Sequence, residues 1–340
     1  MKVLITGSSG FIGSAVVNDL KRQGMTSIGV DLAAPRAGSK PDVFHRVDMC
    51  DATGLRNVIQ AAGVQAVIHL AATHDLTDMS NERIGLTAYH TNTDGTKNLL
   101  DALSEMRGIK RVIFTSTQLI SNIGHQVATL DEARPDTFYG RSKLIGERMI
   151  HAYEKKAYSW VIVRPTTVWG PGMMTHYRRF IGYIEKGWYF HITDRPLYKS
   201  YGYIDNVAHE YVSLLLAQNE DVNRKTFYLA DYDPMSLRDY ANELGNCLGA
   251  RPIRTLPLGL CKFMAVLGDL LARAGFQRFP YTSFRVKNIL NEYVYQLGET
   301  QRVCGPLPVN FREGVVQTVK WYRNSRKNRG EEDSGRIPLG

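Results

Sequence analysis

Three side chains in the first half of the chain have the types needed to move a proton and a hydride. Tyr139 lies four positions before Lys143 in the stretch TFYGRSK, so on a helix the two side chains share one face. Thr117 follows an apolar run in the stretch RVIFTST. A tyrosine has a pKa of about 10, which is too high for a base at neutral pH, but a nearby ammonium group lowers that pKa. The trio therefore suits the deprotonation of an alcohol whose carbon gives up a hydride.

A tyrosine and a lysine at this spacing are frequent by chance and could instead begin an ordinary amphipathic helix. The redox interpretation requires one sheet that carries both Thr117 and a cofactor loop. Apolar β-branched runs alternate with helical patterns, which predicts a Rossmann-type, doubly wound parallel sheet with helices on both faces. The expected strands are Lys2–Thr6, Ser27–Asp31, Ala66–Leu70, Arg111–Ser116 and Trp160–Val163. The expected helices are Phe11–Arg22, Ala52–Ala61, Thr93–Met106 and Tyr139–Tyr153.

A glycine-rich stretch, TGSSGFIG, lies directly between the first expected strand and the first expected helix. Gly7 suits a tight turn, Gly10 allows the backbone to approach a pyrophosphate, and Gly13 allows close packing of helix on strand. The N-terminus of the helix would supply N–H groups and a partial positive charge to the phosphates. The alternative is a plain turn between strand and helix. In this context the spacing predicts a dinucleotide site, and an oxidised nicotinamide would further favour the Tyr139 phenolate.

Asp31 closes the second expected strand, where a carboxylate accepts hydrogen bonds from ribose hydroxyls and repels a 2′-phosphate. This favours NAD over NADP, although Arg36 is close enough in sequence to weaken the preference. The alternative for Asp31 is a carboxylate that caps the next turn. Asp48 could contact the adenine amino group or, like Asp51, could be a helix N-cap.

The pattern changes after Pro165, where segments become shorter and richer in aromatic residues. We expect a Rossmann domain over 1–165 with a returning segment around 200–217, a mostly helical substrate-binding part over 166–322, and a disordered, charged tail over 323–340. The expected helices here are Asn206–Ala217, Leu237–Leu248, Leu258–Ala272, Phe284–Leu290 and Arg312–Arg323.

The most apolar stretch, LPLGLCKFMAVLGDLLAR, covers Leu256–Arg273. It could anchor the protein to a membrane surface or form a core helix. Lys262, Asp269 and Arg273 interrupt the run, and a surface helix normally carries a richer basic face, which favours a core helix.

The composition limits the classes of function. The chain has 340 residues and a net charge of +9, and the positive excess is spread without a long basic run. Such an excess fits an anionic small molecule better than nucleic acid. The cysteines are far apart and form no C-x-x-C pair, which argues against a zinc site and a disulfide framework. No signal peptide or apolar run long enough to span a membrane is visible, so we expect a cytoplasmic protein without an integral membrane segment.

A series of motifs resembles the NAD-dependent nucleotide-sugar epimerase/dehydratase branch of the extended short-chain dehydrogenases/reductases. The matching stretches are TGSSGFIG, HLAA, TNTDGTKNLL, FTST, Tyr139-x-x-x-Lys143, VRPTTVWGPG and YGYIDNVAHEY. The resemblance covers about residues 1–215 in the family's order and is looser after that. It implies that Thr117, Tyr139 and Lys143 are catalytic.

The glycine loop and the resemblance together predict the ligand contacts. The expected cofactor-binding residues are Gly7, Gly10, Phe11, Ile12, Gly13, Asp31, Asp48, Met49, Leu70, Ala71, Ala72, Asn92, Tyr139, Lys143 and Pro165. The expected substrate-binding residues are Thr117, Thr167, Arg178, Lys199 and Arg285. His69 is expected to be a packed strand residue rather than a ligand.

The chain departs from the family's pattern at several places, of which two bear on the reaction type and on substrate binding. Gln118 and Leu119 stand where 4,6-dehydratases carry Asp-Glu, and leucine cannot protonate a leaving hydroxyl, which argues against 4,6-dehydration. Thr167 stands where familiar epimerases carry asparagine near the substrate diphosphate.

The resemblance implies a 4-epimerase of a nucleotide-diphosphate sugar that keeps its NAD. The alternatives are a 4-ketoreductase or dehydrogenase with exchangeable NAD(H), a hydroxysteroid-type dehydrogenase, or a binding module with an inactive site. The resemblance also implies a homodimer through a four-helix interface of Thr93–Met106 and Tyr139–Tyr153.

Overall fold

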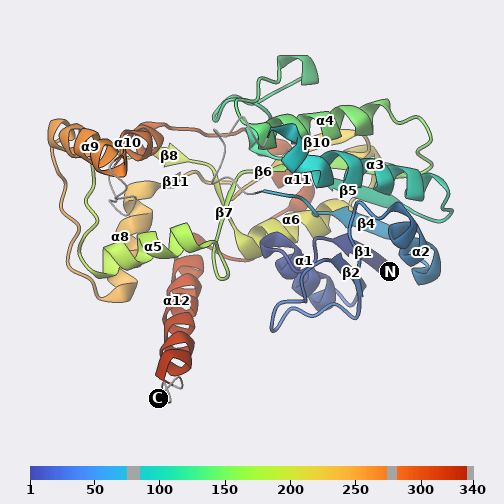
Figure 1. Ribbon diagram of the computed structural model, residues 1–340, viewed down its shortest axis with the longest axis horizontal. Helices are drawn as coiled ribbons and strands as arrows, with labels where there is room; N and C mark the ends of the chain where they lie inside the picture. Colours follow the sequence, from blue (N-terminus) through green and yellow to red (C-terminus); the bar gives the residue numbers. More distant parts are fainter. Residues whose placement is uncertain (75–84, 274–281, 335–340) are drawn as a thin grey trace. The chain divides into compact units, whose positions relative to one another are not determined.

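The computed structural model describes residues 1–74, 85–273 and 282–334 (Figure 1). The chain divides into two compact units. The first unit comprises Met1–Val168, Gly202–Tyr232 and Tyr295–Pro308. The second unit comprises Trp169–Tyr201, Asp233–Val294 and Val309–Gly340.

The first unit is built on a seven-stranded parallel sheet in the order β10-β6-β5-β4-β1-β2-β3. Its strands are β1 (Lys2–Thr6), β2 (Thr26–Asp31), β3 (Val43–Arg46), β4 (Ala66–His69), β5 (Arg111–Thr115), β6 (Ser159–Pro165) and β10 (Lys225–Leu229). The strand order reverses between β1 and β4, and ligands of open α/β sheets bind at the carboxyl ends of the strands beside such a reversal. The predicted fold class is confirmed.

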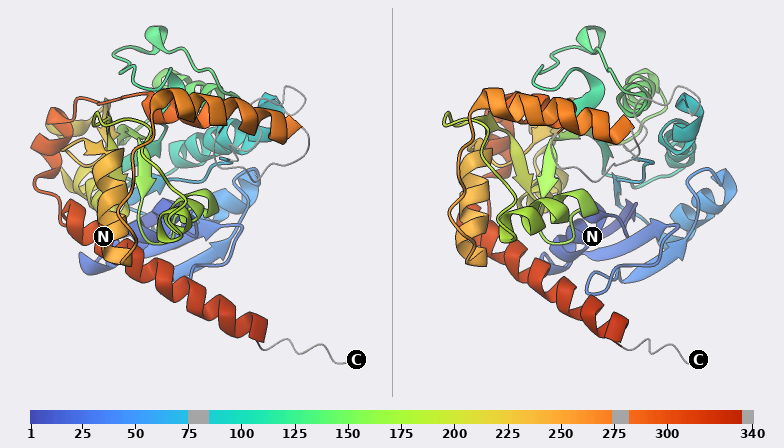
Figure 2. Two further views of the ribbon diagram at one scale, coloured as in Figure 1. Left: turned by 90° about the vertical axis from the view of Figure 1, so that its left-hand side faces the viewer. Right: turned by 60° about the vertical axis from the view of Figure 1, so that its left-hand side comes forward.

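Helices cover this sheet in two groups (Figure 2). α2, α3 and α4 pack in sequence, and their apolar residues, such as Leu99 and Leu103 of α3, join a core with Leu4, Val67 and Val112 of the sheet. α1 and α6 pack against each other, and α6 also contacts β5. The helices are α1 (Phe11–Arg22), α2 (Ala52–Ala62), α3 (His90–Ser104), α4 (Phe138–Ala152), α6 (Ile204–Leu216), α7 (Asn219–Val222) and α11 (Gly298–Cys304). Short 3₁₀ turns lie at Leu86–Tyr89, Gln118–Ile120 and Leu130–Glu132.

Side-chain caps fix where two of these helices begin. Asp51 is the N-cap of α2 and accepts a hydrogen bond from the Gly54 amide at 2.9 Å. Thr137 is the N-cap of α4 and accepts one from the Gly140 amide at 3.0 Å. Each cap satisfies a backbone donor that the helix itself leaves unpaired. The cap at Thr137 sets the point at which Tyr139 enters the first turn of α4.

The second unit is mostly helical. Its helices are α5 (Thr175–Glu185), α8 (Leu237–Leu248), α9 (Leu258–Arg273), α10 (Ser283–Leu290) and α12 (Phe311–Ser334). The remaining short strands are β7 (Thr167–Trp169), β8 (Tyr198–Lys199), β9 (Tyr201–Tyr203) and β11 (Met235–Ser236), of which β8 and β11 pair antiparallel. α8 packs on α5 and α12, and aromatic rings fill the interior: Trp169 lies 5.0 Å from Tyr240 and 6.2 Å from Phe311 between ring centroids.

Two expectations about the later part of the chain differ from the structure. α12 continues to Ser334, so residues 323–334 are helical where a disordered tail was expected, because lysine, arginine and glutamate favour helix even without apolar neighbours. Residues 335–340 lie outside the described residues. α9 was expected to be a core helix, but one of its faces is exposed, with Phe263, Val266 and Leu270 on it. Within the parts that the structure describes, no helix is long and apolar enough to cross a membrane.

Candidate active site

The glycine loop between β1 and α1 has the shape that a dinucleotide requires. Gly7 has a φ of +73°, and a Cβ there would lie 2.7 Å from the Ala71 amide nitrogen. A Cβ on Gly13 would lie 2.1 Å from the Gly7 carbonyl oxygen, so only glycine lets the helix pack this closely. Gly10 is the N-cap of α1, and Phe11 and Ile12 begin the helix. No side chain caps this end of the helix, and its first turn has no acidic residue. This helix end therefore suits an anion, and the cradle fits a pyrophosphate.

Asp31 lies at the end of β2, beside this loop. Its two carboxylate oxygens accept hydrogen bonds from the Ser9 and Ala33 amides, each at 2.9 Å. Each oxygen keeps a further lone pair, so the carboxylate can still accept a ribose hydroxyl. Arg36 donates from Nε to the Ser9 carbonyl oxygen at 3.0 Å, and burial lowers its pKa although Asp31 opposes that shift. Asp31 thus both shapes the loop and places a negative charge at the strand end.

The next acidic candidate, Asp48, is not a helix N-cap. Its Oδ1 accepts a hydrogen bond from the Cys50 amide at 2.8 Å, and Asp51 caps α2 instead. Met49 is buried and packs so close to Gly95 of α3 that a Cβ on Gly95 would lie 2.9 Å from the Met49 Cβ. The adenine contacts of Asp48 and Met49 stay predictions.

Asn92 connects the segment after β4 to the active-site helix. Its side chain exchanges two hydrogen bonds with the backbone of Thr73, at 2.8 and 3.0 Å, and donates a third to Ser142 Oγ of α4 at 2.9 Å. Leu70, Ala71 and Ala72 directly precede Thr73. Asn92 therefore links the active-site helix to the segment that carries the predicted cofactor contacts Leu70, Ala71 and Ala72, and its own contact with the cofactor stays a prediction.

The structure brings Thr117, Tyr139 and Lys143 together at the carboxyl end of β5. A hydrogen bond with Thr117 favours ionisation of Tyr139, but burial dominates and raises the pKa of Tyr139 to about 12. Lys143 donates from Nζ to the Thr115 carbonyl oxygen at 2.9 Å, and burial lowers its pKa to about 8 while Glu147 opposes that change. In the chain alone the phenol pKa is therefore raised, opposite to the expected direction, because burial outweighs the hydrogen bond with Thr117 and Tyr89 raises the pKa further.

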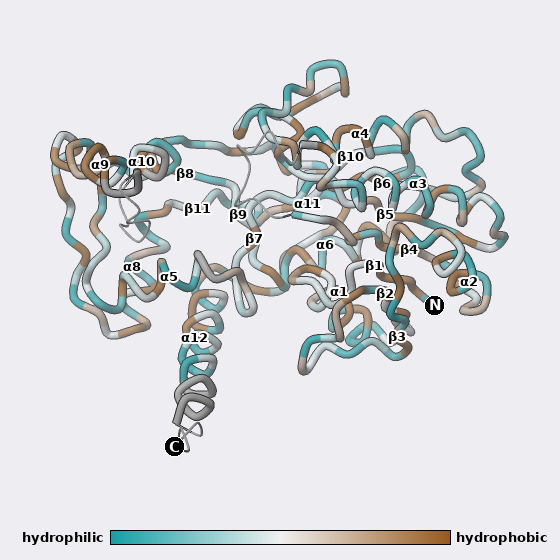
Figure 3. The backbone as a smooth tube through the Cα atoms, viewed as in Figure 1, coloured by the Kyte–Doolittle hydropathy of each residue, from teal (hydrophilic) through white to brown (hydrophobic). Residues whose placement is uncertain are grey.

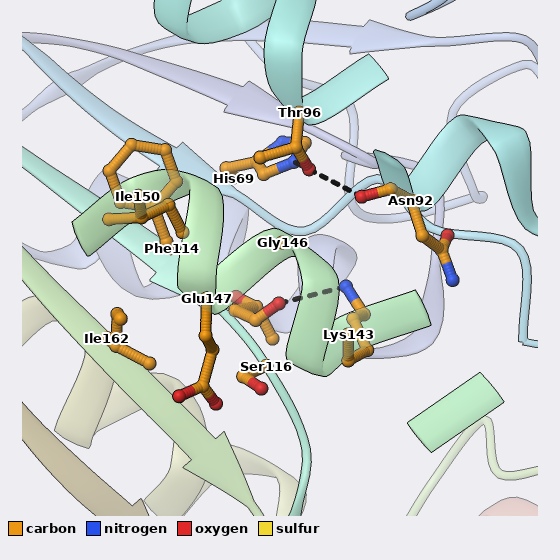
Figure 4. Close-up of a pocket in the computed structure, with 11 residues that line it drawn as sticks. His69, Asn92, Thr96, Phe114, Ser116, Lys143, Gly146, Glu147, Ile150 and Ile162 are labelled. Atoms are coloured by element: carbon orange, nitrogen blue, oxygen red, sulfur yellow. Dashed lines mark hydrogen bonds between the residues drawn. The ribbon is translucent and has the colours of Figure 1, made fainter. Parts of the chain in front are cut away.

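A cavity lies behind Lys143, between β4, β5, α3 and α4 (Figure 4). His69 on its wall is hydrogen-bonded through its two ring nitrogens to Thr6 and Thr96, at 2.7 and 3.1 Å. Burial lowers the pKa of His69 to about 3, so the ring is neutral at physiological pH. His69 is thus a packed strand residue, as the sequence indicated. Glu147 also lines the cavity and forms a buried ion pair with Arg164.

Of the predicted substrate residues, Thr117 and Thr167 lie in the first unit and the others in the second. Gln118 Nε2 is 3.4 Å from Thr167 Oγ1, and Gln118 Oε1 is buried without a hydrogen-bond partner among the described residues. Arg178 donates to Ser325 Oγ at 3.2 Å and lies over the Trp321 ring. Both of these contacts of the Arg178 side chain are made within the second unit, and its contact with a substrate stays a prediction.

Lys199 and Arg285 complete the predicted set. Lys199 is buried, donates to the Asn288 carbonyl oxygen at 2.6 Å and has a pKa lowered by burial to about 8. Arg285 belongs to α10, and its side chain lies outside the described residues. Pro165, from the predicted cofactor set, ends β6 and is paired with Leu229 of β10.

The sequence did not reveal Tyr211 as part of this site. Its hydroxyl lies 2.9 Å from Thr115 Oγ1, on the same residue whose carbonyl holds Lys143. Tyr211 lies on α6 in the stretch YGYIDNVAHEY, and nothing in the spacing of that stretch indicates a contact with β5. The packing of helix α6 against β5 brings Tyr211 and Thr115 together.

Comparison with known proteins agrees with this geometry. Residues 3–228 match the model of the NAD dependent epimerase/dehydratase family. The chain is 24% identical, over 94% of its length and 94% of the relative, to the N-acetyl-alpha-D-glucosaminyl-diphospho-ditrans,octacis-undecaprenol 4-epimerase of Escherichia coli O157:H7. It is 24% identical, over 94% of its length and 90% of the relative, to a 3 beta-hydroxysteroid dehydrogenase/Delta 5-->4-isomerase of Mycobacterium tuberculosis.

Solved structures share the fold. The Thermus thermophilus UDP-glucose 4-epimerase in complex with NAD superposes with a TM-score of 0.70 at 22% identity, covering 96% of this chain and 100% of that one. The Bacillus cereus UDP-glucuronic acid 4-epimerase, in complex with UDP-glucuronic acid and NAD, gives 0.69 at 21% identity, with coverages of 96% and 100%. The family match extends over most of the chain and includes the glycine loop and all three catalytic candidates, so the chain belongs to the NAD dependent epimerase/dehydratase family.

Proposed function

We propose that this chain is an NAD-dependent 4-epimerase of a nucleotide-diphosphate sugar. The observation that carries the proposal is the meeting of Thr117, Tyr139 and Lys143 at the end of β5, in the same sheet as the glycine loop. The family membership and the names of the 4-epimerases that share this fold support it. In this proposal the first unit binds the cofactor and the second supplies most of the substrate contacts.

NAD, when bound, supplies the group that accepts the hydride and later returns it. The residues of the chain handle the proton. The Thr117 hydroxyl holds the 4-hydroxyl of the sugar, and the Tyr139 phenolate takes its proton. Because the pKa of Tyr139 is about 12 in the chain alone, the phenolate requires the positive charges of Lys143 and of the oxidised cofactor. Tyr139 would then return the proton to the C4 oxygen as the hydride is restored on the opposite face of the 4-keto sugar, which would invert the carbon.

The residues after Thr117 support epimerisation over elimination. Gln118 and Leu119 offer no acid that could protonate a leaving hydroxyl, whereas the buried amide oxygen of Gln118 can accept a hydrogen bond from a sugar hydroxyl. A second candidate, a hydroxysteroid-type dehydrogenase, is favoured by the names of several relatives.

The test has two steps. The purified protein is first denatured, and released nucleotides are identified by mass spectrometry; we expect stoichiometric NAD or NADH. The protein is then incubated with UDP-glucose, UDP-N-acetylglucosamine or UDP-glucuronic acid without added cofactor, and C4 inversion is followed by NMR. Inversion without net NADH change supports the epimerase. Product formation that consumes added NADH would instead show a ketoreductase, and NADH formation on a 3β-hydroxysteroid would show the second candidate.

We also propose that two copies pair through α3 and α4. The support is family resemblance and the position of these two adjacent helices on one side of the first unit. Their isologous pairing would form a four-helix interface. Light scattering at micromolar concentration should give a dimer mass, and a monomer mass would contradict the pairing.

A further inference from the structure

α9 presents an apolar face to solvent. Phe263 is 69% exposed, Val266 is 56% exposed and Leu270 is 55% exposed. These residues follow one another at spacings of three and four, so they form a single stripe along the helix. Leu260 and Leu267 are also exposed, lie on the same side of the helix by its 3.6-residue period, and widen the surface. α9 carries hydrophobic residues along most of its length (Figure 3). We call this set of five residues the α9 apolar face.

The opposite side of α9 packs against other residues of the second unit. Cys261 and Ala265 are buried and cluster with Ile192 and with Val286 of α10. Asp269 accepts a hydrogen bond from the Ser283 amide at 3.1 Å, which ties α9 to the start of α10. The helix is therefore packed on one side, and the α9 apolar face is the side that remains exposed. Contiguous apolar surface of this kind marks an interaction site.

The charge around α9 identifies the kind of partner. Residues 249–291 contain seven lysines and arginines and one aspartate, so this segment supplies most of the net charge of +9. The positive excess is thus concentrated here, which corrects the expectation that it is spread over the chain. Arg251, Arg254, Lys262 and Lys287 are exposed, while the only acidic side chain, that of Asp269, is held by the Ser283 amide.

We propose that the α9 apolar face docks on an anionic membrane surface. An apolar stripe on a helix, flanked by basic residues, lies in the interface with its apolar side chains in the acyl boundary and its cations near the headgroups. Because no described helix is long and apolar enough to cross a membrane, α9 would lie on the bilayer. This proposal goes beyond the proposed function and does not depend on it.

The experiment is cosedimentation of the full-length protein with vesicles. One set contains phosphatidylcholine alone, and the other contains phosphatidylcholine with phosphatidylglycerol. We expect binding to the second set that weakens as salt is raised, because anionic headgroups attract the basic segment. Phe263→Glu should weaken binding by about tenfold or more, since it removes a large apolar contact and adds a negative charge. Arg254→Gln should weaken binding by about fivefold on the anionic vesicles.

Matched controls make the result specific. Leu216→Glu introduces the same charge at an exposed leucine at the end of α6 and should bind like the unchanged protein. Thermal melting checks that Phe263→Glu folds, which is expected because the side chain is exposed. The proposal is overturned if the unchanged protein stays in the supernatant with both sets of vesicles. It is also overturned if Phe263→Glu leaves vesicle binding intact, or if it converts a dimer to a monomer in light scattering, because the face would then be a contact between copies.

Discussion

Lys143 donates a hydrogen bond from its Nζ to the carbonyl oxygen of Thr115, 2.9 Å away, and so joins α4 to the end of β5. The contact crosses from one element to another and holds the ammonium group close to the strand end that carries Thr117. Thr115 is in turn contacted by the Tyr211 hydroxyl, at 2.9 Å from its Oγ1. The position of the lysine is thus set by the sheet and by a helix from a later part of the chain.

The first prediction concerns the base. Tyr139→Phe removes the phenolate and should lower kcat by about 10²- to 10⁴-fold, the usual contribution of a positioned acid or base. Binding of NAD should change little, because only the hydroxyl is lost. Steady-state assay and calorimetric titration with NAD measure the two effects. Tyr153→Phe, at the other end of α4, loses hydrogen bonds with Asp101 and Ser104 but none with the catalytic candidates, and is the control. Full activity in Tyr139→Phe would remove this residue from the mechanism.

The second prediction concerns the pH dependence of stability. Burial lowers the pKa of Lys143 from 10.5 to about 8. Between these values the unfolded chain binds more protons than the folded chain, so this group makes the free energy of unfolding rise with pH across that window. Lys143→Met should remove this part of the rise and should be the more stable protein at neutral pH, by up to about 3 kcal/mol.

Urea unfolding at a series of pH values measures this difference. Lys97→Met is the control, because the exposed Lys97 pairs with Asp101 and its pKa is raised rather than lowered. Parallel stability curves for the unchanged protein and Lys143→Met would show that the lysine titrates normally in the folded chain.

The third prediction concerns cofactor choice. Asp31→Asn removes the negative charge at the end of β2, so affinity for NAD should fall about tenfold or more. Discrimination against NADP should fall as well, because the repulsion of a 2′-phosphate is lost. Titration of each dinucleotide gives the two dissociation constants. Asp51→Asn, which keeps a capping side chain on α2, should leave both constants unchanged. If Asp31→Asn leaves the ratio of the NAD and NADP dissociation constants unchanged, another residue determines the selectivity.

The fourth prediction concerns the glycine loop. A Cβ on Gly13 would lie 2.1 Å from the Gly7 carbonyl oxygen, so Gly13→Ala must push α1 away from β1. Overpacking of this kind costs about 1–3 kcal/mol or more, and NAD binding should weaken together with the melting temperature. Gly298→Ala is the matched control, since nothing lies within 4 Å of a Cβ at that position. Equal melting temperatures for the two variants would mean that the loop can relax around the added methyl group.

The fifth prediction concerns the buried ion pair behind the active site. Arg164 and Glu147 form two hydrogen bonds, of 3.0 and 2.8 Å, with side chains that are 4% and 1% exposed. Glu147→Met leaves the buried guanidinium of Arg164 without its charged partner and should destabilise the protein by about 3–5 kcal/mol. The double variant Glu147→Met/Arg164→Met should lose less free energy of unfolding than the sum of the losses in Glu147→Met and Arg164→Met. Chemical denaturation of the four proteins tests this, and simple additivity would show that the two groups do not depend on each other.

The sequence predicted the elements whose signals are local. β1 and α1 have the predicted bounds because an apolar run, a glycine turn and an amphipathic pattern follow one another directly. β3, of sequence VFHR, was missed because it is short and its exposed edge residues include an arginine. β10 was missed because its pairing with β6 joins segments that are far apart in the chain.

The same distinction holds at the site. The spacing of Tyr139 and Lys143 could be read directly, and their common helix was found. The contacts of Thr115 with Lys143 and Tyr211 could not be predicted, because they depend on how α4 and α6 approach β5. The exposed side of α9 was also missed, since a run of apolar residues does not tell which of its faces meets other residues. A local sequence pattern is enough to predict a helix or strand, whereas the residues that surround it depend on how the elements pack.

The first unit takes its residues from three separate stretches of the chain, of which the last ends at Pro308. Strand β10 leaves the ribosome only after the first stretch of the second unit, Trp169–Tyr201, and helix α11 follows most of that unit. Until β10 has been synthesised, β6 has one unpaired edge, and an unpaired edge is open to wrong partners. The sheet cannot be completed before residue 229 has been made, so the nascent protein depends on protection of that edge until then.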